Sequence, residues 1–342
     1  MDCIKMAIVG AGLWGESHAS IYNEHPLVKT VAICDLNKER ATAFAAKFGI
    51  DQVYTDYKEM LKNCGCDAVA IVTPDFLHAD IAIACAEAKK DMIIEKPLAT
   101  TREDVMRMVE AFERNHVRAM VDMHNRWNPA FNSTKQLVSS GKYGKPTNAH
   151  FRLNDNLWVA TDMLKWVEKS SILWFLGSHS LDTSNWIIGD YPVEVYSVKT
   201  EGKLKSIGIN TVDTYMSTFK YRNGAVLQME NSWVTPNGNT NVNDFKFYLL
   251  CTDGSFNVNA SSHDLLQVTD SQRIITEDIL VKNFVFDRCS GFAYESIRSF
   301  IDKLAANEEF HVSVNECANV SLALLATMES ANTGRPVEIE HI

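Results

Sequence analysis

The sequence predicts an α/β chain that begins with a doubly wound parallel sheet and continues as an α+β domain with a mainly antiparallel sheet. Between residues 6 and 122, short apolar runs alternate with helix-length segments, as in parallel sheets whose strands are connected by helices. After residue 123, alternating β segments follow one another through short turns, which is typical of antiparallel pairing. The length of 342 residues also fits two domains. We therefore expect one domain over residues 1–122 and a second over residues 123–342, whose C-terminal helix can pack back on the first.

The first forty residues contain the most specific motif. The apolar run Met6–Val9 leads into Gly10-Ala11-Gly12-Leu13-Trp14-Gly15, a helix is predicted over Glu16–Asn23, and the apolar run Val31–Cys34 ends at Asp35. In such a turn the first glycine allows the tight bend, the second lets a pyrophosphate approach, and the third lets the helix pack on its strand. The N–H groups at the helix start attract phosphates, and an acid after the second strand hydrogen-bonds a ribose diol. This order predicts a dinucleotide site, and the alternative is a βαβ unit that binds no nucleotide.

The rest of the first domain continues the alternation. Helices are predicted at Asn37–Gly49, Thr55–Lys62, Phe76–Lys89 and Thr101–Asn115, and strands at Ala68–Val72, Met92–Ile94 and Arg118–Asp122. Gly10, Asp35, Thr73 and Lys96 each follow a predicted strand. Because ligands of doubly wound sheets bind at the carboxyl ends of the strands, we expect these four residues to line one crevice.

The second domain combines helices with several alternating strands. Helices are predicted at Asn132–Ser140, Ser171–Ile188, Gly291–Leu304 and Val314–Asn332. Strands are predicted at Thr147–Leu153, Pro192–Thr200, Thr211–Tyr221, Ala225–Ser232, Asp244–Cys251 and Ser255–Val258. The turn Arg222-Asn223-Gly224 is a hairpin signal. The pattern predicts an α+β fold for this part of the chain.

Composition narrows the function classes. The net charge of −10 argues against nucleic acid and anionic membrane surfaces as partners. Met1–Lys5 leads directly into the first strand, so we expect no signal peptide, and no run approaches the ~18 apolar residues of a membrane helix. The eight cysteines are scattered, and Cys64-Gly65-Cys66 has no histidine near it. We therefore expect a cytoplasmic protein with reduced thiols and without a metal site.

Seven motifs carry a family resemblance. They are the glycine turn at 10–15, Asp35, Thr73-Pro74 with His78, Glu95-Lys96-Pro97-Leu98, Gly141–Gly144, the helix with His179, and the tail Ser330–Val337. Together they resemble the glucose–fructose oxidoreductase, inositol dehydrogenase and rhizopine-catabolism (Gfo/Idh/MocA) family. The resemblance implies a Rossmann domain, a second domain built on a large open-faced sheet, and a homodimer or homotetramer formed through that open face. It also implies NAD(P)-dependent hydride transfer to or from a sugar, a cyclitol or a related polyol.

Lys96 and His179 are the expected catalytic residues. Hydride transfer needs a base for the hydroxyl proton and a positive charge near the developing alkoxide. Lys96 follows a sheet strand and fits the second role, while a surface lysine is the alternative interpretation. His179 shares a predicted helical face with Phe175, Asp182 and Trp186, and its imidazole suits proton transfer near neutral pH.

Phe175 departs from the family pattern. Many relatives carry an aspartate four residues before the histidine, where this chain has phenylalanine. Three alternatives follow: another carboxylate substitutes, with Asp155 and Asp162 as candidates; His179 works with Lys96 alone; or the chemistry is altered or lost.

Aromatic and basic residues of the second domain are expected near the substrate. Arg126 and Trp127 follow the last strand of the first domain, and tryptophans 158, 166 and 174 are crowded into one stretch. Aromatic faces can stack on sugar rings, and the alternative is a core or interface role for each. The expected substrate residues are Arg126, Trp127, Asp155, Asp162, Trp166 and Phe175.

The cofactor is expected to be NAD rather than NADP. A carboxylate at Asp35 accepts from the ribose diol and repels a 2′-phosphate, although Lys38 and Arg40 can weaken that repulsion. The expected cofactor-binding residues are Gly10, Gly12, Leu13, Trp14, Gly15, Asp35, Thr73, Pro74, His78, Glu95 and Lys96.

Three functions remain open at this level. The leading hypothesis is an NAD-dependent sugar or polyol dehydrogenase with a small carbohydrate substrate. A non-catalytic NAD(P)-binding sensor is favoured by Phe175, whereas the intact Glu95-Lys96-Pro97 motif and His179 favour an enzyme. An enzyme that retains NAD while it acts on glycosides also fits.

Overall fold

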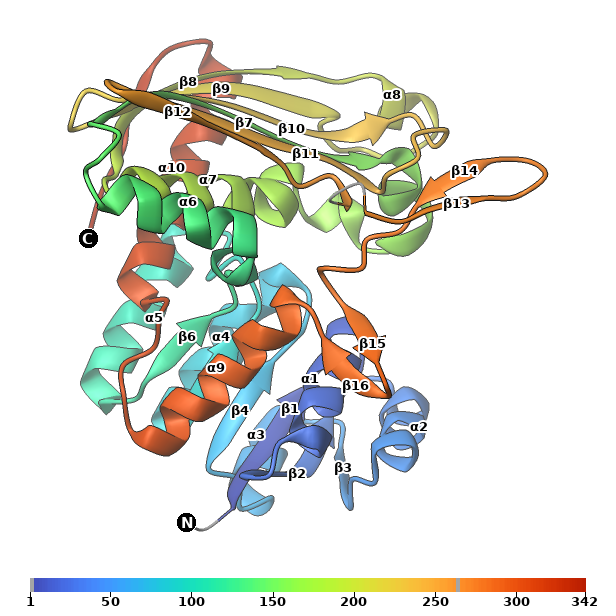
Figure 1. Ribbon diagram of the computed structural model, residues 1–342. Helices are drawn as coiled ribbons and strands as arrows, with labels where there is room; N and C mark the ends of the chain where they lie inside the picture. The colour runs from blue at the N-terminus through green and yellow to red at the C-terminus, as the bar shows by residue number, and fades with distance from the viewer. Residues whose placement is uncertain (1–2, 263–264) are drawn as a thin grey trace. The chain divides into compact units, whose positions relative to one another are not determined.

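The computed structural model describes residues 3–262 and 265–342, which form two compact units (Figure 1). The first unit comprises Met1–His124 and Lys282–Ala318, and the second comprises Asn125–Val281 and Asn319–Ile342. The sequence analysis assigned residues 282–318 to the second domain. They join the first unit because α9 (Phe292–Ala306) packs against α1 (Leu13–Glu24), and because Arg298 binds Glu24 of α1.

The first unit contains the expected parallel sheet. Its strands are β1 (Ile4–Val9), β2 (Val28–Cys34), β3 (Gln52–Tyr54), β4 (Ala68–Ile71), β5 (Asp91–Ile94) and β6 (Ala119–Val121). The order is β3-β2-β1-β4-β5-β6, and every pair is parallel. All four residues of β4 are buried, as expected for a central strand that is covered on both faces. From β1 the strands are added outward to β3 on one side and from β4 to β6 on the other, and the switch between β1 and β4 creates the crevice where such sheets bind ligands.

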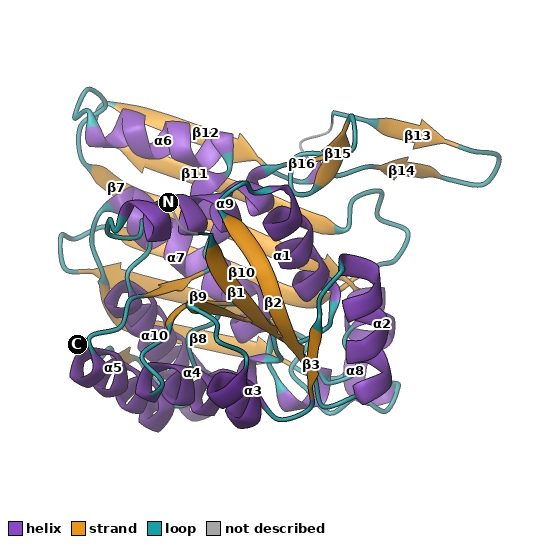
Figure 2. Cartoon of the chain, turned by 90° about the horizontal axis from the view of Figure 1, so that it is seen from below, coloured by secondary structure: helices purple, strands orange, loops and turns teal. Residues whose placement is uncertain are grey.

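Helices cover both faces of this sheet. In addition to α1 and α9 they are α2 (Lys38–Phe48), α3 (Tyr57–Asn63), α4 (His78–Glu87) and α5 (Arg102–Asn115). Helix α1 packs against α2 and α9, whereas α4 packs against α3 and α5 on the opposite side (Figure 2). The helix starts follow from local chemistry, because the side chains of Asn37, Asp56 and Thr101 accept backbone hydrogen bonds at the N-termini of α2, α3 and α5.

The second unit is built on a seven-stranded sheet. Its strands are β7 (Pro146–Asn156), β8 (Pro192–Thr200), β9 (Thr214–Tyr221), β10 (Val226–Thr235), β11 (Asn243–Cys251), β12 (Gly254–Asn259) and β17 (Val337–Glu338). The order is β12-β11-β7-β10-β9-β8-β17, with β7 and β10 parallel and the other pairs antiparallel. This arrangement confirms the predicted mainly antiparallel sheet.

One face of the second sheet carries the core of the unit. Helices α6 (Pro129–Ser139) and α7 (Ser178–Ile188) lie along this face in Figure 1, and α10 (Val314–Thr333), which begins in the first unit, contributes its C-terminal part. Alternate residues of β8 and β9 point the other way, and Tyr196, Val198 and Met216 are 44%, 45% and 49% exposed there. The sheet is therefore open-faced, with apolar side chains on its outer surface.

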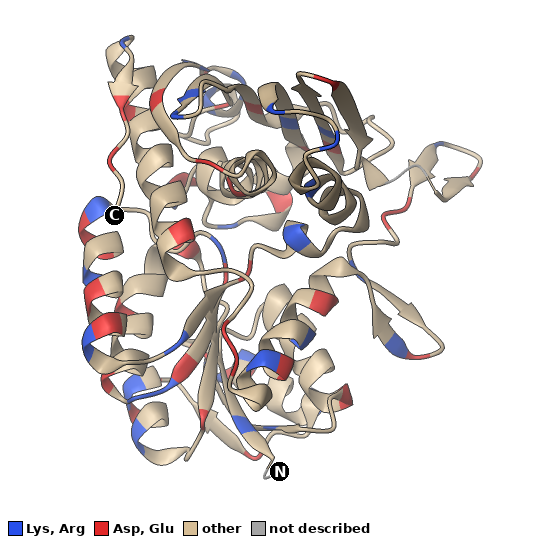
Figure 3. Ribbon diagram, turned by 60° about the vertical axis from the view of Figure 1, so that its left-hand side comes forward, with Lys and Arg blue, Asp and Glu red and all other residues tan. Residues whose placement is uncertain are grey.

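The remaining elements are short. They are α8 (Lys203–Ser206), the hairpins β13–β14 (Gln267–Thr269, Ile274–Thr276) and β15–β16 (Asn283–Val285, Arg288–Ser290), and the turns η1 (Asp75–Leu77), η2 (His124–Trp127), η3 (Val159–Met163), η4 (Val167–Lys169) and η5 (Leu173–Gly177). Basic and acidic residues are interspersed along the chain (Figure 3). Within the described ranges, no helix is both long enough and apolar enough to cross a membrane.

Candidate active site

The glycine turn has a separate steric reason for each glycine. Gly10 has a φ of +114°, and a Cβ there would lie 2.5 Å from the carbonyl oxygen of Val72. A Cβ on Gly15 would collide with the carbonyl oxygen of Gly10, so the third glycine allows α1 to pack close to β1. A Cβ on Gly12, in contrast, would meet nothing within 4 Å. Protein packing therefore does not explain a glycine at position 12, and open space there fits the close approach of a phosphate.

The start of α1 offers free backbone donors to that space. Gly12 is the N-cap residue, and no side chain caps the helix. Leu13 is 67% exposed, and Trp14 behind it is half-buried. Uncapped N–H groups and the positive end of the helix dipole favour an anion at this position.

Asp35 lies at the end of β2, where it is 8% exposed and bonded to the glycine turn. Its Oδ2 accepts from Ala11 N (2.9 Å) and Arg40 Nε (3.1 Å), and its Oδ1 accepts from Asn37 N (2.9 Å) and Arg40 Nη2 (2.6 Å). Burial acts to raise the pKa of Asp35, but the hydrogen bonds from Arg40, Ala11 and Asn37 outweigh it and lower the pKa. Because these four bonds use the acceptor positions of the carboxylate, a ribose diol must displace Arg40 to reach it.

The loops after β4 and β5 are tied together by His78. Its Nδ1 lies 2.8 Å from the carbonyl oxygen of Pro97, and its Nε2 lies 3.0 Å from that of Thr73. The ring is fully buried, so His78 acts on the protein backbone and holds the two loops in register. Lys96 follows β5, is half-buried, and is joined to Pro97 by a cis peptide bond. Burial raises the pKa of Glu95 and the Lys96 charge opposes that rise, whereas burial lowers the pKa of His124 and the Lys96 charge adds to that lowering.

A buried polar cluster lies beneath these loops. It consists of His18 and Tyr22 of α1, Glu95 after β5 and Asp122 after β6. His18 Nδ1 lies 2.9 Å from the Tyr22 hydroxyl, and His18 Nε2 lies 3.7 Å from Glu95 Oε1. Burial raises the pKa values of Glu95 and Asp122, with the Glu95 charge adding to the effect on Asp122, and burial lowers the pKa of His18.

This cluster could hold either a shared proton or a cation. One ligand atom each from His18, Glu95 and Asp122 lies within 4.8 Å of the other two, which is the kind of spacing a metal ion can bridge. The charges of Lys96 and Lys282, however, already act on Glu95. Two ammonium groups thus supply positive charge near the cluster, and burial favours the protonated forms of its two carboxyl groups.

Three residues here were missed by the sequence analysis. Asp122 stands directly after a buried strand, as Asp35 does, and that signal could have identified it. His18 lies one turn beyond Gly15 on a helix whose buried face was not examined for polar residues. Lys282 comes from a segment more than 250 positions later in the chain, and no local pattern indicates its place.

In the second unit, Arg126 is bound by an acidic residue of α7. Its Nη2 and Nε donate to Asp182 at 2.6 and 3.0 Å, and both side chains are buried. The guanidinium also lies 5.7 Å from the ring centroid of Trp186. Asp182 and Trp186 therefore share a helical face, as predicted, and the structure places the Arg126 head group against that face.

His179 lies on a helix that is polar and yet almost wholly buried. Ten of the eleven residues of α7 are buried, and they include serine, threonine, asparagine, aspartate and His179 itself at 7% exposed. Buried polar groups need partners, so such a helix is typical of a site rather than of an apolar core. The preceding turn, Leu173–Gly177, is π-helical, and such turns are frequent at functional sites.

Phe175 lies in the π turn that directly precedes α7, and His179 is the second residue of α7. That the two residues share one helical face stays a prediction. The half-buried Phe175 ring packs against the buried Trp233 at a centroid distance of 5.2 Å and so lies against the apolar core of the unit.

The other expected substrate residues have different environments. Asp155, at the end of β7, is 1% exposed and accepts a hydrogen bond from Asn243. Asp162 is exposed and accepts from the hydroxyl of its neighbour Thr161 at 2.6 Å. Trp127 is half-buried, and Trp166 packs against the core of the unit. Of the two candidate carboxylates, only Asp155 is buried.

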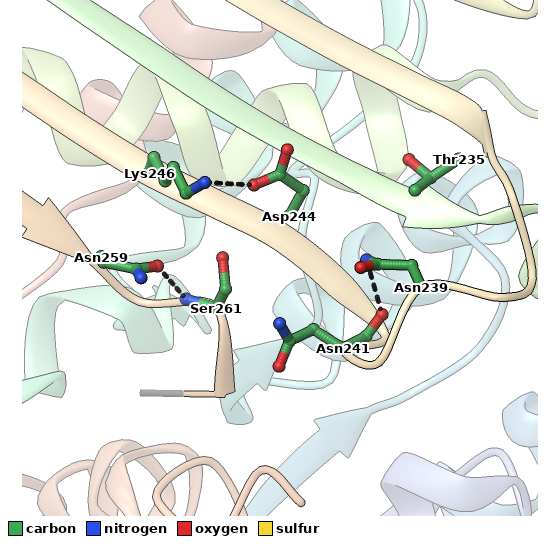
Figure 4. Close-up of a pocket in the computed structure, with 7 residues that line it drawn as sticks. All are labelled: Thr235, Asn239, Asn241, Asp244, Lys246, Asn259 and Ser261. Atoms are coloured by element: carbon green, nitrogen blue, oxygen red, sulfur yellow. Dashed lines mark hydrogen bonds and ion pairs between the residues drawn. The ribbon is translucent and has the colours of Figure 1, made fainter. Parts of the chain in front are cut away.

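A polar pocket of about 230 Å³ lies at the ends of β10, β11 and β12 (Figure 4). Its lining residues are Thr235, Asn239, Asn241, Asp244, Lys246, Asn259 and Ser261. Lys246 and Asp244 form an ion pair at 3.4 Å within it. None of the residues expected from the sequence to bind cofactor or substrate lines this pocket.

Comparison with known families tests the resemblance directly. The model for an oxidoreductase family with an NAD-binding Rossmann fold matches residues 4–123, and the model for the C-terminal domain of the same family matches residues 131–257. The chain belongs to the Gfo/Idh/MocA family of oxidoreductases. The family resemblance inferred from the motifs is thereby confirmed, together with an NAD-binding Rossmann domain that contains the glycine turn, Asp35 and Lys96.

Relatives in this family act on different carbohydrates. The myo-inositol 2-dehydrogenase of Thermotoga maritima is 24% identical over 342 residues and 99% of each chain. The levoglucosan dehydrogenase of Pseudarthrobacter phenanthrenivorans is 29% identical over 78% of this chain and 76% of that protein. The scyllo-inositol dehydrogenase of Lactobacillus casei, solved with NAD(H) and scyllo-inositol, has a TM-score of 0.84 at 17% identity over 98% of this chain and 99% of that one, which shows the same fold.

Proposed function

We propose that this chain is an NAD-dependent dehydrogenase of a cyclitol, sugar or related polyol. The observation that carries the proposal is the combination of open space above Gly12, an uncapped helix start and a buried Asp35, all within an NAD-binding domain of an oxidoreductase family. These residues fit a dinucleotide, because the open space at Gly12 and the uncapped helix start suit the pyrophosphate and Asp35 suits the ribose diol. The relatives named above are dehydrogenases of a cyclitol and an anhydrosugar, which supports this substrate class.

The protein residues would divide the chemistry as follows. Bound NAD would supply the hydride acceptor. The ammonium group of Lys96, at the carboxyl end of β5, would hydrogen-bond the substrate oxygen and stabilise the charge that develops as its proton leaves. An imidazole nitrogen of His179 would take that proton during oxidation and return it during reduction. Asp155 is the carboxylate we propose for orienting the proton-transfer group, because it is buried while Asp162 is exposed.

Arg40 bears on the choice between NAD and NADP. Its guanidinium is 57% exposed and covers the Asp35 carboxylate. Displacement of Arg40 would let Asp35 bind the ribose diol of NAD, as proposed here. The same guanidinium would suit a 2′-phosphate, so the rejection of NADP is expected to be incomplete.

A sensor remains the second candidate, and Phe175 is the observation that favours it. A phenylalanine packed against the apolar core cannot orient His179 or accept a proton. A sensor would bind the dinucleotide without turning over a carbohydrate.

The test is formation of NADH, measured by its absorbance, with a panel of cyclitols, aldoses and anhydrosugars. Wild type would be compared with Lys96→Met and His179→Ala. We expect one polyol class to be oxidised, with the rate lost in both variants. Binding of NADH without turnover of any member of the panel would contradict the dehydrogenase and support the sensor or a retained cofactor.

A further inference from the structure

Lys282 lies against the glycine turn although it is far from it in sequence. Its Nζ is 4.6 Å from the ring centroid of Trp14 and donates to the hydroxyl of Ser17 at 3.3 Å. Trp14 is the second residue of α1 and belongs to the turn itself, and Ser17 lies in the next helical turn. The structure thus brings a second ammonium group, besides Lys96, to the start of the nucleotide-binding helix.

The segment that carries Lys282 is fastened to the same helix. Next to Lys282, the hairpin β15–β16 ends at Cys289 and Ser290, and the backbone N–H of Cys289 donates to Glu24 at the end of α1, at 2.8 Å. Arg298 of α9 binds the other oxygen of Glu24 at 3.1 Å and the carbonyl oxygen of Cys289 at 2.6 Å. The segment contacts the start of α1 through Lys282 and the end of α1 through Glu24. It therefore runs along this helix.

The charge of Lys282 is directed toward the β5 and β6 side of the crevice. It opposes the rise that burial causes in the pKa of Glu95 after β5, and it adds to the lowering that burial causes in the pKa of His124 after β6. His124 in turn stacks on Trp14 at a centroid distance of 5.1 Å. Burial lowers the pKa of Lys282 itself, while the Glu95 and Glu16 carboxylates favour its ammonium form.

That side of the sheet is where the nicotinamide half of a dinucleotide belongs. In a doubly wound sheet the acid after β2 marks the adenosine half, and the second half of the ligand faces the strands beyond the switch point. Asp35 follows β2, whereas Glu95 and His124 follow β5 and β6. Lys282 therefore lies between the helix start and the nicotinamide side.

We propose that Lys282 sets the preference of the site between oxidised and reduced nicotinamide. This inference rests on the proposed function, because it requires NAD to bind in the crevice. The nicotinamide ring carries a positive charge in NAD⁺ and none in NADH, whereas the rest of the molecule is the same. An ammonium group held nearby repels only the oxidised form, so it weakens NAD⁺ binding relative to NADH and favours the reduced cofactor on the enzyme.

The test compares dissociation constants for NAD⁺ and NADH, measured by calorimetry, in wild type, Lys282→Met, Lys282→Gln and Lys282→Arg. The Gln variant keeps a hydrogen-bond donor for Ser17 if the Met variant folds poorly. Lys62→Met, which removes an exposed lysine of α3, is the matched control for loss of a charge. We expect the ratio Kd(NAD⁺)/Kd(NADH) to fall about tenfold in the Met and Gln variants and to stay unchanged in the Arg and control variants.

The ratio separates this role from a structural one. Equal weakening of NAD⁺ and NADH binding in the Met and Gln variants would overturn the proposal, because loss of local structure or of a phosphate contact affects both forms alike. If wild type binds neither form, the proposed function itself fails, and this inference fails with it.

Discussion

At the scale of single residues, we propose that Asp35 and Arg40 set the preference for NAD over NADP at the adenosine end of the cofactor. We predict that Arg40→Ala strengthens NADH binding and weakens NADPH binding, each by about threefold. The effect is small because the Arg40 side chain is exposed and such an ion pair with Asp35 is worth ~1 kcal/mol or less. The change uncovers Asp35 for the ribose diol and removes a partner for a 2′-phosphate. Energy transfer from tryptophan to the bound reduced nicotinamide measures both affinities.

Lys62→Ala is the control for Arg40, since Lys62 is an exposed lysine of α3 that belongs to none of the expected cofactor-binding residues. Weaker binding of NADH in Arg40→Ala would mean that Arg40 stays in place and helps to bind the ribose, contrary to the prediction.

Asp122 gives a pH-dependent prediction. Burial raises the pKa of Asp122 to about 8 and that of Glu95 to about 7, so both are protonated more easily in the folded chain than in the unfolded one. A carboxyl group whose pKa is higher in the folded chain stabilises the fold fully when the pH is below its pKa in the unfolded chain, which is near ~4. That stabilisation is lost as the pH rises through its pKa in the folded chain. We therefore expect the Tm of wild type to fall by roughly 5 °C between pH 5 and pH 9, and that of Asp122→Asn to fall less.

Thermal unfolding followed by circular dichroism across this pH range provides the check, with Asp51→Asn, an exposed acid, as the control. His18 has the opposite sign, because burial lowers its pKa to about 4, and its effect is confined to the acid side. If the Tm of Asp122→Asn falls between pH 5 and pH 9 as much as that of wild type, the Asp122 carboxyl group does not cause the loss of stability.

At the scale of elements, different glycines of the β1–turn–α1 unit are expected to affect stability and cofactor binding. We predict that Gly15→Ala lowers the Tm, because its Cβ would collide with the carbonyl oxygen of Gly10. Gly12→Val should leave the Tm within about 2 °C of wild type but weaken NADH binding at least about tenfold, because the protein leaves space at Gly12 that the phosphates are proposed to use. Measurement of Tm and NADH affinity on both variants distinguishes the two roles, and normal NADH binding by Gly12→Val would contradict the proposed site.

The same elements show what the sequence could and could not predict. Five of the six parallel strands were predictable because they are buried runs that end in turn or acid residues, whereas β3 has only three half-buried residues and gives no such signal. The π turn at Leu173–Gly177 was not predictable, since an apolar run has the same composition in an α and a π turn.

The candidate site was predictable where its residues stand in local motifs. The glycine turn, Asp35 and Lys96 follow directly from strand ends. Lys282 depends on a segment, 282–318, that belongs to the first unit although it follows residues 125–281 of the second, and only the folded chain shows that return.

At the scale of the whole molecule, the open face of the second sheet supports the proposed homo-oligomer. Tyr196, Val198 and Met216 lie on neighbouring strands and are more than two-fifths exposed, and Val198 pairs with Met216 across β8 and β9. We predict that Met216→Lys shifts the chain toward monomer, because a charge buried without a partner opposes association. Analytical ultracentrifugation tests this, with Lys62→Met, at an exposed position of α3 in the first unit, as the control. A wild-type chain that sediments as a monomer would contradict the prediction.

The central claim concerns hydride transfer assisted by Lys96, and one comparison tests it most directly. With the substrate found in the panel, kcat and the dissociation constant of NADH would be measured for wild type, Lys96→Arg and Lys96→Met. The account predicts that Lys96→Met loses at least about a hundredfold in kcat, since a group that stabilises developing charge is removed, while NADH binding changes by less than about threefold. Retention of kcat in Lys96→Met, with cofactor binding intact, would contradict the account.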